Sequence, residues 1–217
     1  MNGLITYNNQ SATIALPHNK YVDRVLGSNS FEELWWRFKG ADSPSKEISE
    51  SYAAFSNLKK QCIIKDYSWL HIGDGAYTRT AAIFTFFSKT KNYSVDPLIN
   101  EERFHLWREK YDVQNIHISK TKFENFEHDF KSPYGITCVH AHVDLEDVDK
   151  KFPDWAFLYT NACCFPTKQM FSQKYMLENK IIKMIDKYDL GITGHERRIV
   201  VYKNTRFRDK NGNIIYL

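Results

Sequence analysis

The sequence has few cysteines and no long apolar segment among its 217 residues. No hydrophobic run reaches the length that spans a bilayer, and the N-terminal residues lack the charged and apolar regions of a secretory signal. The four cysteines (Cys62, Cys138, Cys163 and Cys164) are too few and too unevenly spaced for a disulfide framework, and none forms a zinc-type CxxC pair. These absences predict a cytoplasmic protein with reduced thiols and no membrane partner.

A large excess of one charge is also missing. The chain carries 30 Lys and Arg residues against 26 Asp and Glu, so its formal net charge of +4 permits a polyanionic partner without requiring one. At 205–210 Phe207 lies between two arginines, an arrangement that can hold a nucleic-acid strand, although a solvated surface is more common. The partner therefore stays open between a small molecule and a nucleic acid, and the oligomeric state is unknown.

Apolar and aromatic residues are plentiful. They make up 42% and 15% of the chain, which is enough for a sizeable core rich in Phe, Tyr and Trp. A weakly patterned N-terminus up to about residue 30 predicts a short hairpin or an arm. Two helices are expected next, at 31–38 after a capping Ser30 and at 45–60. We expect residues 1–62 to form this arm and a helical cap, and residues 63–217 to form the main domain.

Strands and helices then alternate along the chain. Strands are expected at about 67–72, 92–96, 115–119, 135–141 and 155–161. Helices are expected at TAAIFTFF (80–87) and at about 98–110 and 121–130, and an acidic segment follows 141. Such alternation is typical of a parallel sheet covered on both faces. The predicted fold class is α/β, a Rossmann-like three-layer sandwich.

The C-terminal part breaks this alternation. A long helix is predicted over 167–188, followed by strands at about 190–193 and 197–203. Only Gly194 and its neighbours separate the two strands, which leaves no room for a crossover helix. The sheet is therefore expected to be mostly parallel with an antiparallel last strand.

Two glycines follow the first predicted strand of the main domain. Gly73 and Gly75 permit a positive φ and a close approach of the backbone to a ligand, while the third position of a GxGxxG pattern is Thr78. The following helix offers unpaired N–H groups. Asp96 ends the next strand, 21 residues after Gly75, where an acid can bind a ribose diol. The alternative is a tight turn at Gly73 and a helix cap at Asp96.

Arg79 follows this loop in the first turn of a helix, where a cation opposes the helix dipole. It could contact a ligand carboxylate or phosphate. The alternative is a surface salt bridge, to Asp74 or to Asp96. Both interpretations stay open.

The order of elements resembles that of the class I S-adenosylmethionine-dependent methyltransferases. The segments that carry the resemblance are LHIGDGAYT (70–78), SVDP (94–97) and ITGHERRIVVYK (192–203). The resemblance covers about 67–203 and implies S-adenosylmethionine as cofactor. It implies that Gly73, Asp74 and Gly75, with Thr78 and Arg79 beside them, bind its methionine end, and that Asp96 binds its ribose.

Two positions differ from that family. His71 stands where an acidic residue usually precedes the glycines, and no NPPY- or DPPY-type motif follows the fourth strand of the main domain. The expected activity is methyl transfer to an unidentified acceptor. The alternative is a non-catalytic binding module that has lost or changed its ligand.

His140, His142 and Asp144 follow that fourth strand at alternate positions, so on an extended segment they would share one face. They could bind the acceptor or serve as a general base, since histidine titrates near neutral pH. A second interpretation is a metal-dependent hydrolase using an HxHxD cluster. In the third, His140 is buried in the strand and Asp144 caps a helix.

Asn161 ends the next strand and is expected to face the same cleft, where it could hydrogen-bond the acceptor. Cys163 or Cys164 could be nucleophilic only with a positive group nearby, and buried inert thiols are the favoured interpretation.

Overall fold

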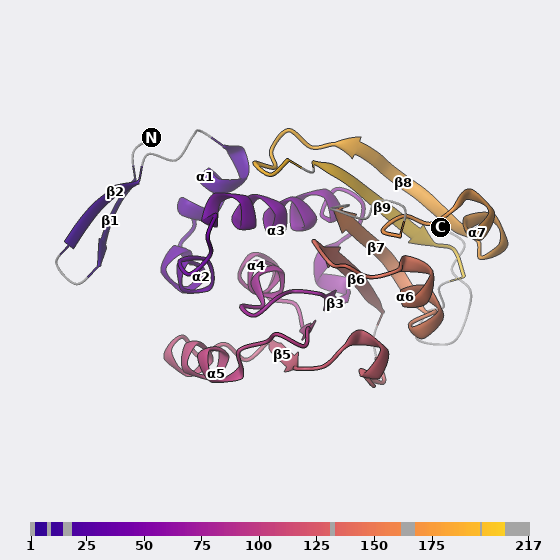
Figure 1. The fold of residues 1–217 in the computed structure, drawn as a ribbon, viewed down its shortest axis with the longest axis horizontal. Coiled ribbons are helices and arrows are strands. Elements are labelled where there is room, and N and C mark those ends of the chain that lie inside the picture. Colours follow the sequence, from indigo (N-terminus) through magenta and orange to yellow (C-terminus); the bar gives the residue numbers. More distant parts are fainter. Residues whose placement is uncertain are drawn as a thin grey trace.

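The computed structural model describes the backbone of residues 3–7 and 10–14, and backbone and side chains of residues 19–130, 133–161, 168–195 and 197–206. Seven strands within these ranges form one sheet in the order β5-β4-β3-β6-β7-β9-β8 (Figure 1). Their bounds are β3 Ser68–Ile72, β4 Asn92–Val95, β5 Ile116–Ser119, β6 Tyr134–Val139, β7 Trp155–Asn161, β8 Ile181–Tyr188 and β9 Arg198–Asn204. A separate antiparallel hairpin joins β1 (Gly3–Tyr7) and β2 (Gln10–Ile14).

The strand directions confirm the predicted mixed sheet. Strands β3 to β7 run parallel, whereas β9 is antiparallel to both β7 and β8. Strand β3 lies between β4 and β6, so the chain leaves it first toward one edge and later toward the other. Ligands bind at the carboxyl ends of the strands beside such a switch point. The candidate site is therefore expected where β3, β4 and β6 end.

Helices cover both faces of the sheet. Figure 1 shows α2, α4 and α5 on one side of the strands and α6 and α7 on the other. The helices are α1 Lys20–Leu26, α2 Phe31–Phe38, α3 Pro44–Leu58, α4 Arg79–Ser88, α5 Glu101–Lys110, α6 Leu145–Lys151 and α7 Gln173–Glu178. Residues of β3 alternate between the two apolar clusters beneath these layers, with Trp69 in one and Leu70 in the other. This arrangement is the predicted three-layer sandwich.

The predicted cap helices are present as α2 and α3. Both contribute to the same apolar cluster as α4 and β3, and Phe55 of α3 packs against Phe84 of α4. Helix α1, capped by Asn19, lies in a region that was expected to form only a hairpin or an arm. The division after residue 62 stays a prediction. None of the helices in the described ranges has the length and apolar character of a membrane span.

The long helix predicted over 167–188 is wrong. Helix α7 has six residues, Lys180 adopts a left-handed φ of 54°, and the following Ile181–Tyr188 forms edge strand β8. The β-branched Ile181, Ile182 and Ile185 suit a strand, and pairing with β9 decides the local structure. No strand forms at 190–193, because Gly191 N–H donates to Asp189 in the connection between β8 and β9.

The helix predicted over 121–130 is also wrong. Only a 3₁₀ turn at Phe123–Asn125 forms, and the segment then packs its aromatic side chains on the sheet. Phe130, for example, stacks on Tyr134 with ring centroids 4.2 Å apart. Tertiary packing of aromatic rings therefore prevails over the helical spacing of the sequence.

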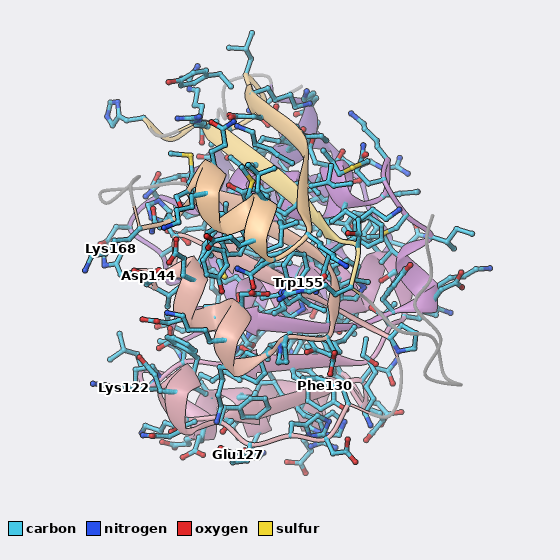
Figure 2. All side chains as sticks on the ribbon, turned by 90° about the vertical axis from the view of Figure 1, so that its right-hand side faces the viewer. Lys122, Glu127, Phe130, Asp144, Trp155 and Lys168 are labelled. Atoms are coloured by element: carbon cyan, nitrogen blue, oxygen red, sulfur yellow. The ribbon has the colours of Figure 1, made fainter. Side chains whose placement is uncertain are left out.

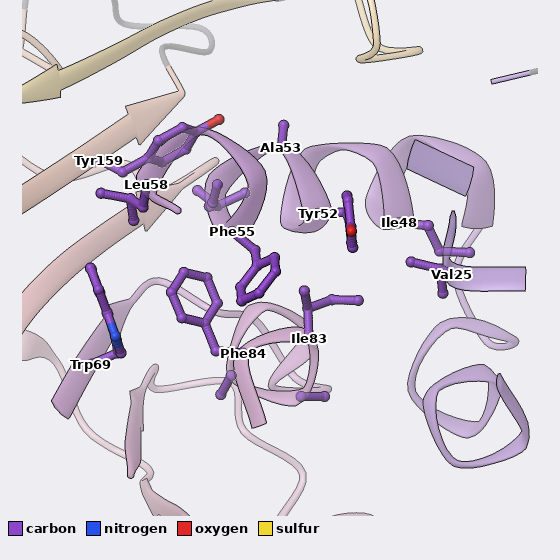
Figure 3. Packing of buried hydrophobic residues seen from close by; sticks show 14 of the residues in the cluster. Val25, Ile48, Tyr52, Ala53, Phe55, Leu58, Trp69, Ile83, Phe84 and Tyr159 are labelled. Carbon is purple, nitrogen blue, oxygen red and sulfur yellow. The ribbon is translucent and has the colours of Figure 1, made fainter. Parts of the chain in front are cut away.

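Phe84 lies at the centre of the larger apolar cluster, where its ring contacts Phe55 and Trp69 (Figure 3). We expect Phe84→Ala to lower the free energy of unfolding by about 3 to 5 kcal/mol, because truncation leaves a cavity in a packed core. Urea denaturation checks this. Leu106, 58% exposed on α5, is the control, and Leu106→Ala should change stability by less than about 0.5 kcal/mol. Equal losses in the two variants would contradict this core.

Candidate functional site

The connection from β3 to α4 is a tight glycine turn. Gly73 and Gly75 have φ of 68° and 69°, in the left-handed region that favours glycine. A Cβ atom on Gly73 would lie 2.7 Å from Cβ of Ala141, whereas a Cβ on Gly75 would meet nothing within 4 Å. The turn therefore packs directly against the loop after β6 at Gly73 and stays open at Gly75.

Asp74 points into the protein and organises the turn. Its carboxylate accepts hydrogen bonds from the N–H groups of Thr80 (2.7 Å) and Ala81 (3.1 Å) and from the hydroxyl of Ser94 (3.0 Å). Burial raises the pKa of Asp74, while His71 and the hydrogen bonds from Ala81 and Thr80 oppose the rise. Asp74 thus caps α4 from within the turn and ties it to β4.

Asp96 connects the ends of β3 and β4. Its two carboxylate oxygens accept hydrogen bonds from the N–H groups of Gly75 (3.0 Å) and Leu98 (2.7 Å). The alternative interpretation as cap of the next helix is wrong, because the N-cap of α5 is Asn100. A carboxylate oxygen has two lone pairs, so each oxygen of Asp96 can accept a further hydrogen bond.

Arg37 of α2 supports the same turn and was missed in the sequence. Its Nε donates to the carbonyl of Tyr77 (2.6 Å) and its Nη2 donates to the hydroxyl of Thr78 (3.0 Å). The guanidinium lies 4.7 Å from the ring of Trp107, and burial lowers its pKa to about 10. A charged residue within the aromatic run at 31–38 was the available signal. Thr78, with φ of 49°, is held by this arginine.

Arg79 forms a salt bridge, but not with either predicted partner. Its Nη1 lies 2.9 Å from Oε2 of Glu47 on α3, and its Nε donates to the carbonyl of Arg37. The guanidinium also lies 4.9 Å from the centre of the Tyr77 ring. The predicted bridge to Asp74 or Asp96 is therefore wrong, and α3 fixes this arginine beside the glycine turn.

His140 does not continue strand β6. It adopts a left-handed φ of 55°, so His140, His142 and Asp144 do not share one face of an extended segment as expected. His140 Nε2 lies 3.2 Å from Oε1 of Glu50 on α3. Asp144 caps α6 by accepting from Glu146 N–H at 3.0 Å, which confirms the structural interpretation of that residue.

The metal interpretation is not supported. Across the described ranges, no three His, Cys, Asp or Glu side chains are grouped so as to hold a metal ion. Asn161 is fully buried, and its Nδ2 donates to the carbonyl of Arg198, which ties β7 to β9. Cys163, Cys164 and Phe207 lie outside the described residues.

Two adjoining cavities lie over the ends of β3, β4 and β6. They have volumes of about 340 and 350 Å³ and share Gly73, Asp96, Pro97 and His142 in their walls. The first extends toward α3 and α4 and is also lined by Glu47, Ser51, Gly75, Arg79, Thr80 and His140. The second extends toward α6 and includes Lys122 and Asp144, which lie on the same side of the molecule in Figure 2. Together they form the candidate site.

No protein-family model matches the sequence, and no curated protein matches it significantly. Solved structures do. Magnesium protoporphyrin IX methyltransferase from Synechocystis with bound S-adenosylmethionine has a TM-score of 0.53 at 12% identity, over 88% of this chain and 100% of that one. A proposed RNA methyltransferase from Pyrococcus horikoshii has a TM-score of 0.52 at 11% identity, over 82% and 98%. The chain has the class I methyltransferase fold.

The methyltransferase fold brings most of the predicted site residues together. Seven of them line the first cavity: Gly73, Asp74, Gly75, Arg79, Asp96, His140 and His142. Asp144 lines the second cavity, whereas Thr78 and Asn161 line neither. Glu47 and Ser51 of α3 reach the first cavity although nothing in the sequence pattern marked them. The helical cap therefore contributes part of the wall of the site.

The two glycines of the turn offer a matched test of this geometry. Gly73→Ala should lower the free energy of unfolding by about 1 to 3 kcal/mol or more, since the new Cβ meets Ala141 in addition to the strained φ. Gly75→Ala should cost only the backbone strain, about 1 to 2 kcal/mol. Urea denaturation of both variants measures the difference. A greater loss in Gly75→Ala would contradict the close contact between the turn and the loop after β6.

Proposed function

We propose that the protein binds S-adenosylmethionine and transfers its methyl group to an acceptor. The observation that carries this proposal is the contact between Asp96 and the N–H of Gly75, which sets a carboxylate and an open glycine turn in one cleft at the switch point. The methyltransferase fold and the presence of S-adenosylmethionine in a structural neighbour support the same cofactor. When bound, this cofactor supplies an activated methyl group on a positively charged sulfur.

The turn would hold the methionine end of the cofactor. Gly75 leaves space for a ligand above the backbone, and the N-terminus of α4 favours a negative group nearby. Arg79 lines this cavity with its guanidinium already oriented by Glu47, so it can pair with a ligand carboxylate. In this proposal Asp74 and Thr78 act from behind the turn, since their polar atoms bind α4, β4 and Arg37.

Asp96 would bind the ribose. Each of its oxygens already accepts one backbone N–H and can accept one ribose hydroxyl through its second lone pair. The second cavity continues from Asp96 past Phe123, an apolar ring suited to a flat aromatic base. The ligand would therefore extend from the first cavity into the second.

The acceptor would approach from the side of the loop after β6. His140 and His142 line the first cavity, and methyl transfer needs mainly alignment of the acceptor, plus a base where the acceptor loses a proton. Asp144 and Asn161 would act through the backbone of α6 and β9, which they hold in place. The acceptor is a small molecule or a nucleic acid.

Isothermal titration with S-adenosylmethionine and S-adenosylhomocysteine tests the proposal. We expect binding by the unmodified protein and an affinity about 10-fold to 100-fold lower in Asp96→Ala, because two hydrogen bonds to a charged group are lost. Asp154→Ala is the matched control, since Asp154 is exposed and precedes β7 at the opposite end of the sheet. It should bind like the unmodified protein.

The absence of heat with either ligand, in a protein whose circular dichroism shows it to be folded, would contradict the proposed cofactor. Equal affinity in Asp96→Ala and Asp154→Ala would contradict the role of Asp96. Binding without transfer to any acceptor would instead favour a non-catalytic module of the same fold.

A further inference from the structure

Helix α3 places two carboxylates against basic side chains of the first cavity. Glu47 and Glu50 are three residues apart, so they lie on the same side of the helix. Glu47 pairs with Arg79 at 2.9 Å, and Glu50 lies 3.2 Å from the imidazole of His140. Both basic side chains line the cavity. Each is therefore held by an acid from the helical cap.

Glu50 is an unusual residue to bury. Its side chain is only 1% exposed, and within the described part of the chain neither carboxylate oxygen has a hydrogen-bond partner, so the contact with His140 is a charge contact at 3.2 Å. Burying a carboxyl group without hydrogen bonds costs free energy of folding, so its presence in the structure calls for an explanation. The connection before β9 comes close as well, because a Cβ on Gly194 would lie 2.7 Å from Glu50 Oε1. The protein thus packs closely around an acid that lies beside a histidine.

His140 has a strained backbone at the same place. A φ of 55° is uncommon for a residue with a Cβ atom, and such strain concentrates at functional sites. Its neighbour Ala141 packs on Gly73 of the glycine turn. The sulfur of S-adenosylmethionine is bonded both to the methionyl chain and to the ribose, so it would lie between the turn and Asp96. His140 lines the same cavity as the turn and Asp96.

We propose that Glu50 positions His140 to take a proton from the methyl acceptor, which must then be a protic oxygen or nitrogen nucleophile. This inference rests on the proposed function. A carboxylate beside Nε2 favours a proton on that nitrogen and stabilises the charged imidazolium that forms, so Nδ1 is the basic atom. Glu50 is the positioning residue and His140 the general base.

The step balances in atoms and charge. His140 Nδ1 takes the proton that the acceptor's hydroxyl or amine loses as its oxygen or nitrogen gains the methyl group. The electron pair of the broken carbon–sulfur bond stays on sulfur, which becomes neutral. The imidazolium then returns its proton to water.

Other charged or titratable groups surround the pair. From the neighbouring elements these are Lys46 and Glu47 of α3, Asp74 of the glycine turn, Arg79 of α4, His142 of the same loop, Tyr159 of β7, and Asp189 and His195 of the connection before β9. Among them only the histidines ordinarily titrate near neutral pH. The test therefore compares the three histidines.

Proton release on ligand binding tests the inference without knowledge of the acceptor. The sulfonium of S-adenosylmethionine disfavours a protonated imidazole beside it, whereas the thioether of S-adenosylhomocysteine is neutral. Titration calorimetry in two buffers of different ionisation enthalpy, from pH 5.5 to about 8 around the ordinary histidine range, gives the protons released. We expect more release with S-adenosylmethionine, and loss of this difference in His140→Gln.

Glu50→Gln separates a positioning role from a structural one. The glutamine side chain keeps the shape and an accepting oxygen of Glu50 but has no charge to favour the imidazolium. Proton release should therefore be largest at a lower pH than in the unmodified protein. His195 is exposed beside Gly194, so His195→Gln should leave the pH profile of proton release unchanged. Two outcomes would overturn the inference while leaving cofactor binding intact. One is that the difference in proton release between the two ligands is lost in His142→Gln instead of His140→Gln. The other is that the pH profile of proton release does not move in Glu50→Gln. Failure of both ligands to bind would remove the proposed function itself.

Discussion

The close packing of Gly73 against Ala141 is the constraint on which the site depends. Strands β3 and β6 are parallel neighbours, so the turn after one and the loop after the other leave the sheet side by side. Because Gly73 has no Cβ, these two segments approach within a distance that any other residue would increase. Asp96 then joins the turn from the next strand through the N–H of Gly75. The ends of three strands are thereby held together.

The helical cap also supports the segments that follow these strands. Arg37 of α2 holds the carbonyl of Tyr77 and the hydroxyl of Thr78, and its own charge is compensated by buried aromatic faces. Helix α3 contributes Glu47 and Glu50, which orient Arg79 and His140. The packing of the cap therefore helps to set the positions of side chains that line the cavity.

Local sequence signals predicted the alternating part of the fold well. Strands β3 to β7 and helices α2 to α5 follow the expected order, because apolar spacing and helix caps are local features that burial reinforces. The same reasoning failed at 121–130 and 167–188, where apolar residues also occur at helical spacing. In these two segments, aromatic stacking by Phe130 and pairing of β8 with β9 supply the stronger interaction. The spacing of apolar residues along the chain carries no information about such contacts with residues distant in the sequence.

The sequence by itself determined the glycine turn, the acid 21 residues later, and the α/β class with its antiparallel strand. These depend on backbone freedom, short-range spacing and the length of a connection. Only the tertiary structure decided which side chains support the site. Glu50 and His140 are 90 residues apart, and Arg37 and Thr78 are 41 apart, so each pairing depends on how helices pack on the sheet. Asp74, predicted at the ligand loop, was found to cap α4 only in the structure, because the fold turns its carboxylate toward the N–H groups of Thr80 and Ala81.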